Sequence, residues 1–219
     1  MSTERQALVL VAHADDETLG CGGTIRKLLT GGWKVEVVIL SDGVIATREE
    51  THNDNRAHAA SACAVLGIGP PRILGFSDQR FDTIPIADLA NAVSKLKLEP
   101  DLILTHVDSD LNRDHRLVCE VAKIIGRPRR KPISLLGCEI PNTTFWNGAQ
   151  FPANYYVDIS NEIDAKVEAF SCYVNEIQPY PSPWSREGLK LLAQFHGMQS
   201  GFDFAEAFQV IRGYEGRLP

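Results

Sequence analysis

Short apolar runs rich in β-branched residues alternate with longer segments of helical period over the first two-thirds of this chain. The apolar runs lie at residues 8–12, 35–40, 72–74, 101–105 and 133–137. The helical segments lie at residues 18–30, 53–66, 86–98 and 115–125. This alternation is typical of βα units on a parallel sheet. We therefore expect an α/β fold, a three-layer sandwich around a mostly parallel, twisted sheet.

The last third changes character and predicts a mixed α/β C-terminal extension. Residues 141–152 are turn-rich and aromatic. They are followed by a strand at 155–158, a helix after Ser160, a helix at 185–201 with Ser185 as its N-cap, and a closing strand at 205–211. There is no internal repeat and no linker long enough to separate two units. We expect a single domain over residues 1–219.

Charge and composition narrow the classes of partner. The chain has 22 basic and 28 acidic residues, a formal charge of -6, which argues against nucleic acid or an anionic membrane. Its apolar runs are shorter than the ~18 residues of a membrane span, and the N-terminus lacks the pattern of a signal peptide. Five scattered cysteines without a CxxC pair are typical of reduced thiols in a cytoplasmic protein.

Two dense clusters of imidazoles and carboxylates follow the first and the fourth predicted strands. The first reads His13-Ala14-Asp15-Asp16-Glu17, and the second lies within residues 105–116. In the common doubly wound order, strand order reverses between these two strands, and ligands bind at that point beyond the carboxyl ends of the strands. The topology therefore predicts that the two clusters meet.

Carboxylates crowded this closely are costly unless a cation neutralises them, and imidazole and carboxylate ligands suit zinc or a similar divalent ion. His13 and Asp16 can face one ion across the turn, while His115 approaches from the second loop. Three protein ligands leave a position for water, which is the pattern of a catalytic site. The alternative is a set of solvated acids that cap a helix.

Several motifs in order resemble the PIG-L (LmbE-like) family of zinc-dependent N-deacetylases. They are Ala12-His13-Ala14-Asp15-Asp16-Glu17, Asp42-Gly43, Arg56 through Leu66-Gly67, Asp110-Leu111-Asn112-Arg113-Asp114-His115-Arg116 and Ala205-Glu206-Ala207-Phe208. Two further stretches, Phe76 to Asp82 and Tyr173-Val174-Asn175-Glu176, are similar to the branch found in bacterial surface-polysaccharide sugar pathways. The resemblance implies a Rossmann-like sandwich.

The resemblance also implies a set of roles at the first two clusters. His13, Asp16 and His115 would bind Zn²⁺ or another divalent metal, and Asp15 would be the general base. A divalent ion lowers the pKa of its water toward ~7 and polarises an amide carbonyl. Asp114 would assist by orienting a ligand or capping the helix, and belongs with the catalytic candidates.

Some positions depart from the family pattern. Asn112 stands where many members have a histidine that acts as acid or oxyanion donor, and His106 is a candidate substitute; its alternative role is a strand-end histidine that bonds backbone. The candidate substrate-binding residues are Arg56, Asp82, Asn112, Glu139, Trp184 and His196, with Asn142 and Trp146 as further candidates for the pocket wall. Arg56 could instead form a surface ion pair, and Trp184 could pack on its own domain.

The function predicted from these features is removal of an N-acetyl group from a small-molecule amino sugar, with a nucleotide-linked sugar as the expected form. Another small N-acyl compound is an alternative. A dinucleotide-binding protein is a weaker one, because Gly20-Cys21-Gly22-Gly23 lacks the last glycine of the fingerprint, with Ile25 in its place, and follows acids that would repel a pyrophosphate. A further alternative is a metal-dependent sugar-binding module without catalysis. Asp15 argues against it, because binding alone does not need a free base beside the metal.

Overall fold

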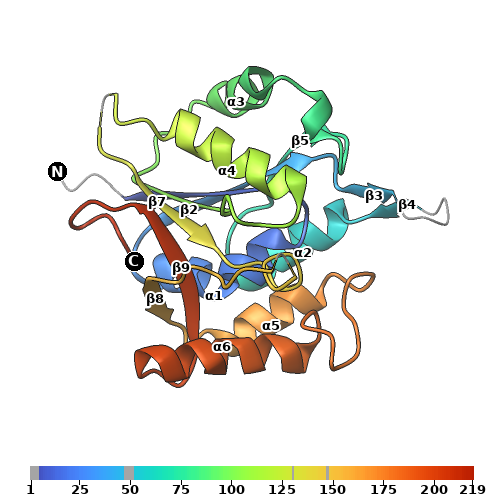
Figure 1. Cartoon of the computed structure of the whole chain (residues 1–219), viewed down its shortest axis with the longest axis vertical. Coiled ribbons are helices and arrows are strands. Elements are labelled where there is room, and N and C mark those ends of the chain that lie inside the picture. The colour runs from blue at the N-terminus through green and yellow to red at the C-terminus, as the bar shows by residue number, and fades with distance from the viewer. Residues whose placement is uncertain (1–4, 47–51, 130, 147) are drawn as a thin grey trace.

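The computed structural model describes residues 5–46, 52–129, 131–146 and 148–219 as an α/β sandwich (Figure 1). The strands are β1 (Gln6–Val11), β2 (Lys34–Ser41), β3 (Val44–Ala46), β4 (His52–Asp54), β5 (Arg72–Phe76), β6 (Leu102–Thr105), β7 (Ser134–Cys138), β8 (Tyr155–Asp158) and β9 (Ala205–Arg212). The helices are α1 (Asp16–Thr30), α2 (Arg56–Leu66), the short 3-10 helix η1 (Phe81–Thr83), α3 (Ile86–Ser94), α4 (Arg113–Ile125), α5 (Ile163–Ser171) and α6 (Arg186–Ser200).

The main sheet has seven strands in the order β5-β2-β1-β6-β7-β9-β8. The first five of these run parallel to their neighbours, and β9 pairs antiparallel with both β7 and β8. The prediction of a mostly parallel sheet with a mixed C-terminal extension is confirmed. Strand order reverses between β1 and β6, so the loops after these two strands lie side by side.

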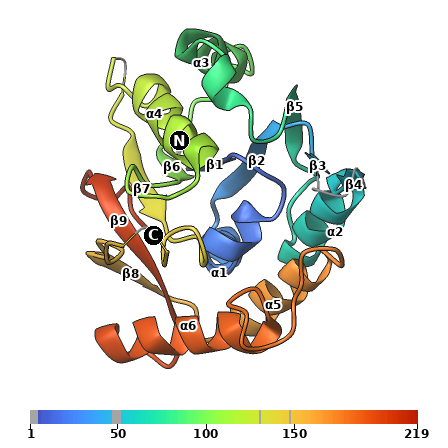
Figure 2. The same cartoon turned by 45° about the vertical axis from the view of Figure 1, so that its right-hand side comes forward.

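Helices cover both faces of the sheet, and β1 is accordingly apolar and buried from Ala7 to Val11. Ala7, Val9 and Val11 face one core with residues of α1, α2 and α5. Leu8 and Leu10 face the other core with residues of α3 and α4. Figure 2 shows α3 and α4 on one side of the sheet and α1, α2 and α5 on the other, with α6 beyond.

Two predicted helix boundaries were wrong. The second helix begins at Arg56 and not near residue 53, because the backbone of 52–54 pairs with 44–46 as a hairpin, and the Asn55 N–H donates to the Gly43 carbonyl at 2.8 Å. The third helix ends at Ser94 and not at Leu98. Lys97 has a φ of 54°, which an α-helix cannot contain.

Small residues let α1 approach its neighbours closely. A Cβ at Gly20 would lie 2.5 Å from the sulfur of Cys138 on β7, and one at Gly23 would lie 2.7 Å from Ile159. Gly20 and Gly23 therefore lie on the side of α1 that packs against these neighbours. In a dinucleotide-binding fold they would instead open the turn toward a pyrophosphate.

A buried ion pair holds α1 against the C-terminal part of the chain. The helix is interrupted at Cys21, whose φ is -150°. The Glu206 carboxylate accepts the backbone N–H groups of Gly23 at 2.9 Å and Thr24 at 2.7 Å, just after this break. The Lys166 ammonium lies 2.5 Å from the same carboxylate and also donates to the Leu19 carbonyl. Glu206 thus caps the second half of α1.

All five cysteines are free, and four of them are buried. Among the described residues, no helix combines the length and the apolar character that crossing a membrane requires.

Candidate active site

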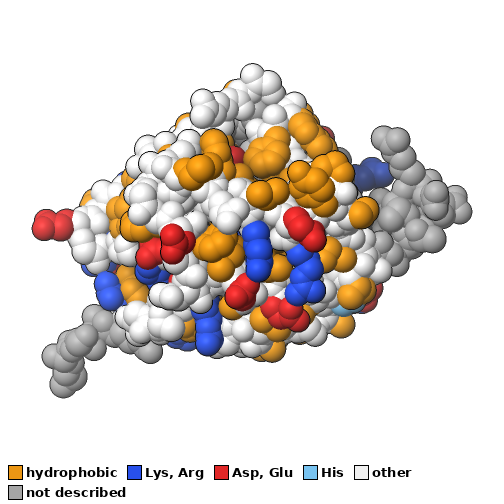
Figure 3. All heavy atoms as spheres, turned by 90° about the horizontal axis from the view of Figure 1, so that it is seen from below, with side chains coloured by type: hydrophobic (Ala, Val, Ile, Leu, Met, Phe, Trp, Pro, Cys, Tyr) orange, Lys and Arg blue, Asp and Glu red, His pale blue; other side chains and the backbone are white. Residues whose placement is uncertain are grey.

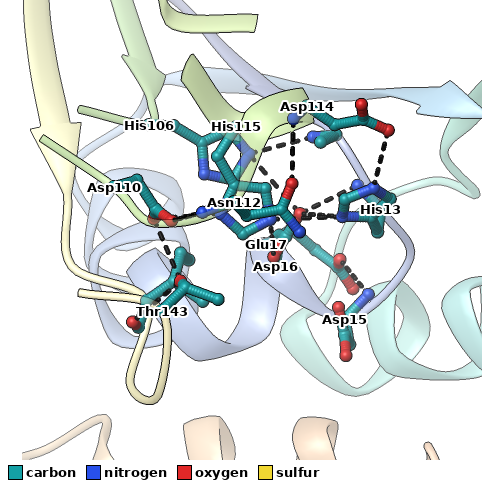
Figure 4. A network of polar contacts seen from close by, with 12 residues as sticks. His13, Asp15, Asp16, Glu17, His106, Asp110, Asn112, Asp114, His115 and Thr143 are labelled. Carbon is teal, nitrogen blue, oxygen red and sulfur yellow. Dashed lines mark hydrogen bonds and ion pairs between the residues drawn. The ribbon is translucent and has the colours of Figure 1, made fainter. Parts of the chain in front are cut away.

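The two clusters predicted to meet do so at the carboxyl ends of β1 and β6. The turn after β1 supplies His13, Asp15 and Asp16, and the loop after β6 with the start of α4 supplies Asp110 and His115. Figure 4 shows these side chains converging from the two segments. They are buried, although this edge of the sheet is where a ligand would enter.

Three residues place potential ligand atoms within a small volume. His13 Nδ1 is 3.1 Å from His115 Nε2 and 3.5 Å from Asp16 Oδ2. His115 Nε2 is 3.4 Å from Asp16 Oδ1. These residues form a group that could hold a metal ion. Two imidazole nitrogens and one carboxylate are a donor set that zinc binds in catalytic sites.

The second nitrogen of His115 is held by a carboxylate. His115 Nδ1 lies 3.0 Å from Asp110 Oδ2, and the Thr143 hydroxyl donates to the same oxygen at 3.0 Å. This contact leaves Nε2 of His115 directed at the shared volume. A carboxylate behind a ligating histidine fixes its tautomer and ring orientation.

His13 is oriented in the same manner from its other side. Its Nε2 lies 3.2 Å from Asp78 Oδ1, 3.3 Å from Asp114 Oδ2 and 3.3 Å from the Gln79 amide nitrogen. The other Asp114 oxygen accepts the Phe81 N–H at 3.2 Å. Asp114 therefore contacts a candidate ligand, His13, and is not itself among the three converging residues.

The charges of the site fit a cation. Burial alone would lower the pKa of His13, but hydrogen bonds to Asp114 and Asp16 and the nearby charge of Asp78 raise that pKa well above its ordinary value. Burial alone would raise the pKa of Asp16, yet His115 and His106 hold it well below its usual range. The cluster thus favours positive charge beside an ionised carboxylate. A bound divalent ion would supply that positive charge.

His106 lies behind the three converging atoms and is completely buried. Its Nε2 accepts the Ala12 N–H at 2.9 Å, and its ring stacks on His115 with centroids 4.0 Å apart. These contacts are those of the alternative, a strand-end histidine that bonds backbone. A direct catalytic role for His106 stays a prediction.

Asp15 has an unusual backbone conformation at the start of α1. Its φ is 129°, a region that residues other than glycine rarely adopt and that costs about 1–3 kcal/mol. Its carbonyl accepts the N–H groups of Thr18 and Leu19, each at 3.0 Å. Figure 4 shows its carboxylate to one side of Asp16 and His13. Burial and the negative charges of Asp16, Glu176 and Glu17 raise the pKa of Asp15 well above its usual value, which suits a proton acceptor.

Glu17 and Tyr173 hold Asp15 in this conformation. The Asp15 N–H donates to Glu17 Oε2 at 3.1 Å, and the Tyr173 hydroxyl donates to Glu17 Oε1 at 2.5 Å. Both Glu17 and Tyr173 are fully buried. Burial raises the pKa of Glu17 to about 7, against the opposing effect of the Tyr173 hydrogen bond.

Replacing Tyr173 with phenylalanine is expected to lower kcat by about tenfold, because the loss of a hydrogen bond to a carboxylate frees Glu17 and lets Asp15 relax. Metal content should not change, because Tyr173 contacts none of the three ligand atoms. Tyr155→Phe is the matched control, since the Tyr155 hydroxyl donates to the Pro219 carbonyl in the C-terminal segment of the chain. Equal kcat values for the two variants would remove Tyr173 from this role.

Two of the candidate substrate residues have partners of their own within the chain. Arg56 is exposed and makes a two-pronged ion pair with Asp54, with its Nη2 2.6 Å from Asp54 Oδ2. Asn112 is the N-cap of α4, and its side chain accepts the Asp114 N–H at 2.8 Å. Asp82 is exposed in η1. Arg56 thus forms the surface ion pair that the sequence offered as its alternative.

Glu139 and His196 contact each other. His196 Nε2 is 2.6 Å from Glu139 Oε2. They line a cavity of about 20 Å³ together with Lys166 and Glu206. A cavity of this size holds a water molecule, and a role for this pair in substrate binding stays a prediction.

Trp184 packs inward, as its alternative predicted. Its Nε1–H donates to the Pro141 carbonyl at 2.8 Å, and its ring meets Phe170 edge to face at 6.5 Å. Trp184 therefore contacts the turn at residue 141. A role for its ring in substrate binding stays a prediction.

Sequence reasoning did not assign roles to Asp78, Asp110 or Tyr173. Asp78 follows β5, whose carboxyl end lies at the same edge of the sheet as those of β1 and β6. That position was a usable signal, as was the place of Asp110 five residues before His115. Tyr173 approaches from just beyond the end of α5 across the helix layer, and no local pattern predicts that contact.

A family model described as "PIG-L: GlcNAc-PI de-N-acetylase" matches residues 8–125, which is more than half of the chain. The chain belongs to the PIG-L family. The matched segment contains both histidine and carboxylate clusters of the candidate site.

Relatives agree with this assignment. The diacetylchitobiose deacetylase of Thermococcus kodakarensis is 24% identical over 230 residues, which cover 95% of this chain and 84% of that protein. A probable N-acetyl-alpha-D-glucosaminyl L-malate deacetylase of Bacillus cereus is 28% identical over 124 residues, 51% of this chain and 56% of that protein. Family and relatives together support the N-deacetylase class for this PIG-L chain.

The fold also agrees with a solved structure. The N,N'-diacetylchitobiose deacetylase of Pyrococcus horikoshii superposes with a TM-score of 0.75 at 21% sequence identity, over 94% of this chain and 84% of the other. The three-layer sandwich predicted from strand and helix alternation is therefore the fold of a PIG-L protein.

Proposed function

We propose that this PIG-L chain is a metal-dependent hydrolase that removes the acetyl group from the nitrogen of an amino sugar. The observation that carries the proposal is the convergence of His13, Asp16 and His115 with Asp15 beside them. Each of the two histidines has its remaining nitrogen held by a carboxylate. Zn²⁺ is the ion that this donor set suits best.

Different residues of the site have different roles in the proposed reaction. His13, Asp16 and His115 would hold a divalent ion, which when bound would activate a water and polarise the acetyl carbonyl. Asp15 accepts the proton of the attacking water as the new C–O bond forms. It then delivers that proton to the sugar nitrogen as the C–N bond breaks, leaving acetate and a free amine. Glu17 and Tyr173 keep Asp15 in position throughout.

The resemblance to the polysaccharide-sugar branch makes a nucleotide-linked amino sugar the first substrate to test. The two stretches that carry this resemblance reach the site. Asp78 and Gln79 contact His13, and Tyr173 contacts Glu17. A cytoplasmic location belongs with this proposal, because nucleotide-linked sugars are made there and the cysteines are free.

The experiment is a panel of free and nucleotide-linked N-acetyl sugars, scored by acetate release and by loss of one acetyl mass from the sugar. Other N-acyl compounds belong in the same panel. Acetate release that a chelator abolishes and added Zn²⁺ restores supports the proposal. Hydrolysis of every active substrate at an unchanged rate in the presence of the chelator would refute the metal-dependent route.

An exposed aromatic residue belongs to the turn that contacts the candidate site through Thr143. The Trp146 side chain is 67% exposed at the end of the turn that carries Thr143. Thr143 in turn donates to Asp110, which holds His115. The face of an indole ring offers an apolar surface of the kind that packs on a sugar ring.

Trp146→Ala is expected to raise KM by about tenfold with little change in kcat, because a contact equal in ground state and transition state affects binding alone. Trp146→Phe keeps an aromatic face and should retain most of the affinity. The measurement is steady-state kinetics on the best substrate of the panel. An unchanged KM for Trp146→Ala would show that this ring does not contact the substrate.

A further inference from the structure

The loop between β5 and η1 reaches the candidate site and is anchored there at two points. Asp78 Oδ1 lies 3.2 Å from His13 Nε2. The Phe81 N–H donates to Asp114 Oδ1 at 3.2 Å, and the Phe81 ring stacks on the His13 ring with centroids 6.1 Å apart. Gln79 lies between these two anchors, so its backbone is held in place beside His13.

Gln79 is exposed, although it contacts a buried member of the site. Its amide nitrogen lies 3.3 Å from His13 Nε2, whereas His13, Asp16 and His115 are each at most 7% exposed. Gln79 therefore lies on the solvent side of His13. In the proposed function the acetyl group would lie at the ligand atoms, and the sugar that carries it would extend toward the solvent.

The amide of Gln79 is not needed to hold His13. Nδ1 of His13 faces the other two converging residues, so an ion bound there would leave the ring hydrogen on Nε2. Asp78 and Asp114 each present a carboxylate oxygen to Nε2. The amide nitrogen of Gln79 can only donate, and in this tautomer Nε2 has no lone pair to accept from it. The amide is therefore available to a ligand.

The backbone at Gln79 has a conformation that suits glycine. Its φ is 54°, in the left-handed region. Among the described residues seven glycines have a positive φ, and the residues of other types that share it are Asp15, Gln79, Lys97 and Asn142. Glycine would fit this turn with less strain, so the turn alone does not explain a glutamine there. An outlier of this kind beside a candidate site indicates a use for the side chain.

We propose that Gln79 is a specificity-determining residue, whose amide binds a hydroxyl group on the sugar ring of the substrate. This rests on the proposed function, because it requires an N-acetyl sugar with its acetyl group at the three converging residues. An amide offers donors and an acceptor, and a sugar hydroxyl both donates and accepts. Gln79 thus favours N-acetyl sugars over N-acyl compounds without ring hydroxyls.

The test compares Gln79→Gly with Lys97→Gly on the best sugar substrate of the panel. Both substitutions place glycine at a φ of 54° in an exposed position, so their backbone effects are matched. Lys97 lies on the loop before β6, at the opposite end of that strand from the site. Gln79→Gly is expected to raise KM about tenfold with little change in kcat, whereas Lys97→Gly should change neither.

Metal content is the second measurement, made on the same preparations. Gln79→Gly should keep the metal content of the wild type, because Asp78 and Asp114 still contact His13. Gln194→Ala is a further control. It removes an exposed glutamine amide from α6, on the side of the molecule that Figure 3 views, and should leave KM unchanged.

An unchanged KM for Gln79→Gly overturns the proposal. So does an equal rise in KM for either control, or a loss of metal in Gln79→Gly, which would show that Gln79 supports His13 instead. Failure of the proposed function is a different result: the wild type then releases acetate from no sugar of the panel, and both proposals fall. If only the role of Gln79 is wrong, the wild type is active and Gln79→Gly matches it.

Discussion

Asp15→Asn is expected to retain its metal and lose about 10²- to 10⁴-fold in kcat, the range of a general base. The amide has the size of the carboxylate but cannot accept the proton of the attacking water. Asparagine also tolerates a positive φ better than most residues, so the strained backbone at position 15 should persist. KM should change little, since Asp15 is expected to act on the reacting proton.

The measurement pairs kinetics with metal analysis of the same preparation. Asp16→Asn is the contrasting variant, because it weakens one of the three ligand positions and should lose metal and activity together. A rate for Asp15→Asn near that of the wild type would remove Asp15 as the base. Loss of metal in Asp15→Asn would reassign it to metal binding.

Glu206→Ala is expected to lower the free energy of unfolding by about 3–5 kcal/mol, the cost of removing one partner of a buried ion pair. Lys166 and Glu206 are each only 4% exposed. The substitution leaves the Lys166 ammonium with the Leu19 carbonyl as its remaining partner. It also removes the acceptor for the two backbone N–H groups after the break in α1.

Urea denaturation measures this effect. Lys190→Ala is the control, because its ion pair with Asp164 is exposed and should contribute less than about 1 kcal/mol. If Glu206→Ala does not fold, Glu206→Gln replaces it, because the amide has a similar shape and retains an acceptor. Its loss in the free energy of unfolding should lie between those expected for Glu206→Ala and Lys190→Ala. Equal losses for Glu206→Ala and Lys190→Ala would show that the buried pair does not hold α1.

The sheet could be predicted because the sequence pattern of each strand is local and recurs along the chain. Each parallel strand is a short apolar run, and the reversal of strand order in a doubly wound sheet is enough to place the turn at His13 beside the loop containing His115. The helix start at Arg56 was missed because it depends on a hairpin between segments that have no strong strand pattern.

The site was predictable where one turn or one loop carries several chemical groups, as at His13 to Glu17. It was less predictable where the role depends on which side chain a residue meets in three dimensions. Glu139 and His196 satisfy each other, and Tyr173 reaches Glu17 from another layer of the sandwich. His106 has the right chemistry for catalysis, but its contacts with the Ala12 N–H and the His115 ring depend on packing. Such roles follow from packing and not from residue type.

We propose that His13, Asp16 and His115 hold the ion on which deacetylation depends. The most direct measurement is metal content and acetate release on one preparation, before chelation, after chelation and after return of Zn²⁺. We expect one ion per chain, loss of both signals with the chelator, and recovery of both with the metal. Acetate release that persists in protein shown to contain no metal would contradict this account.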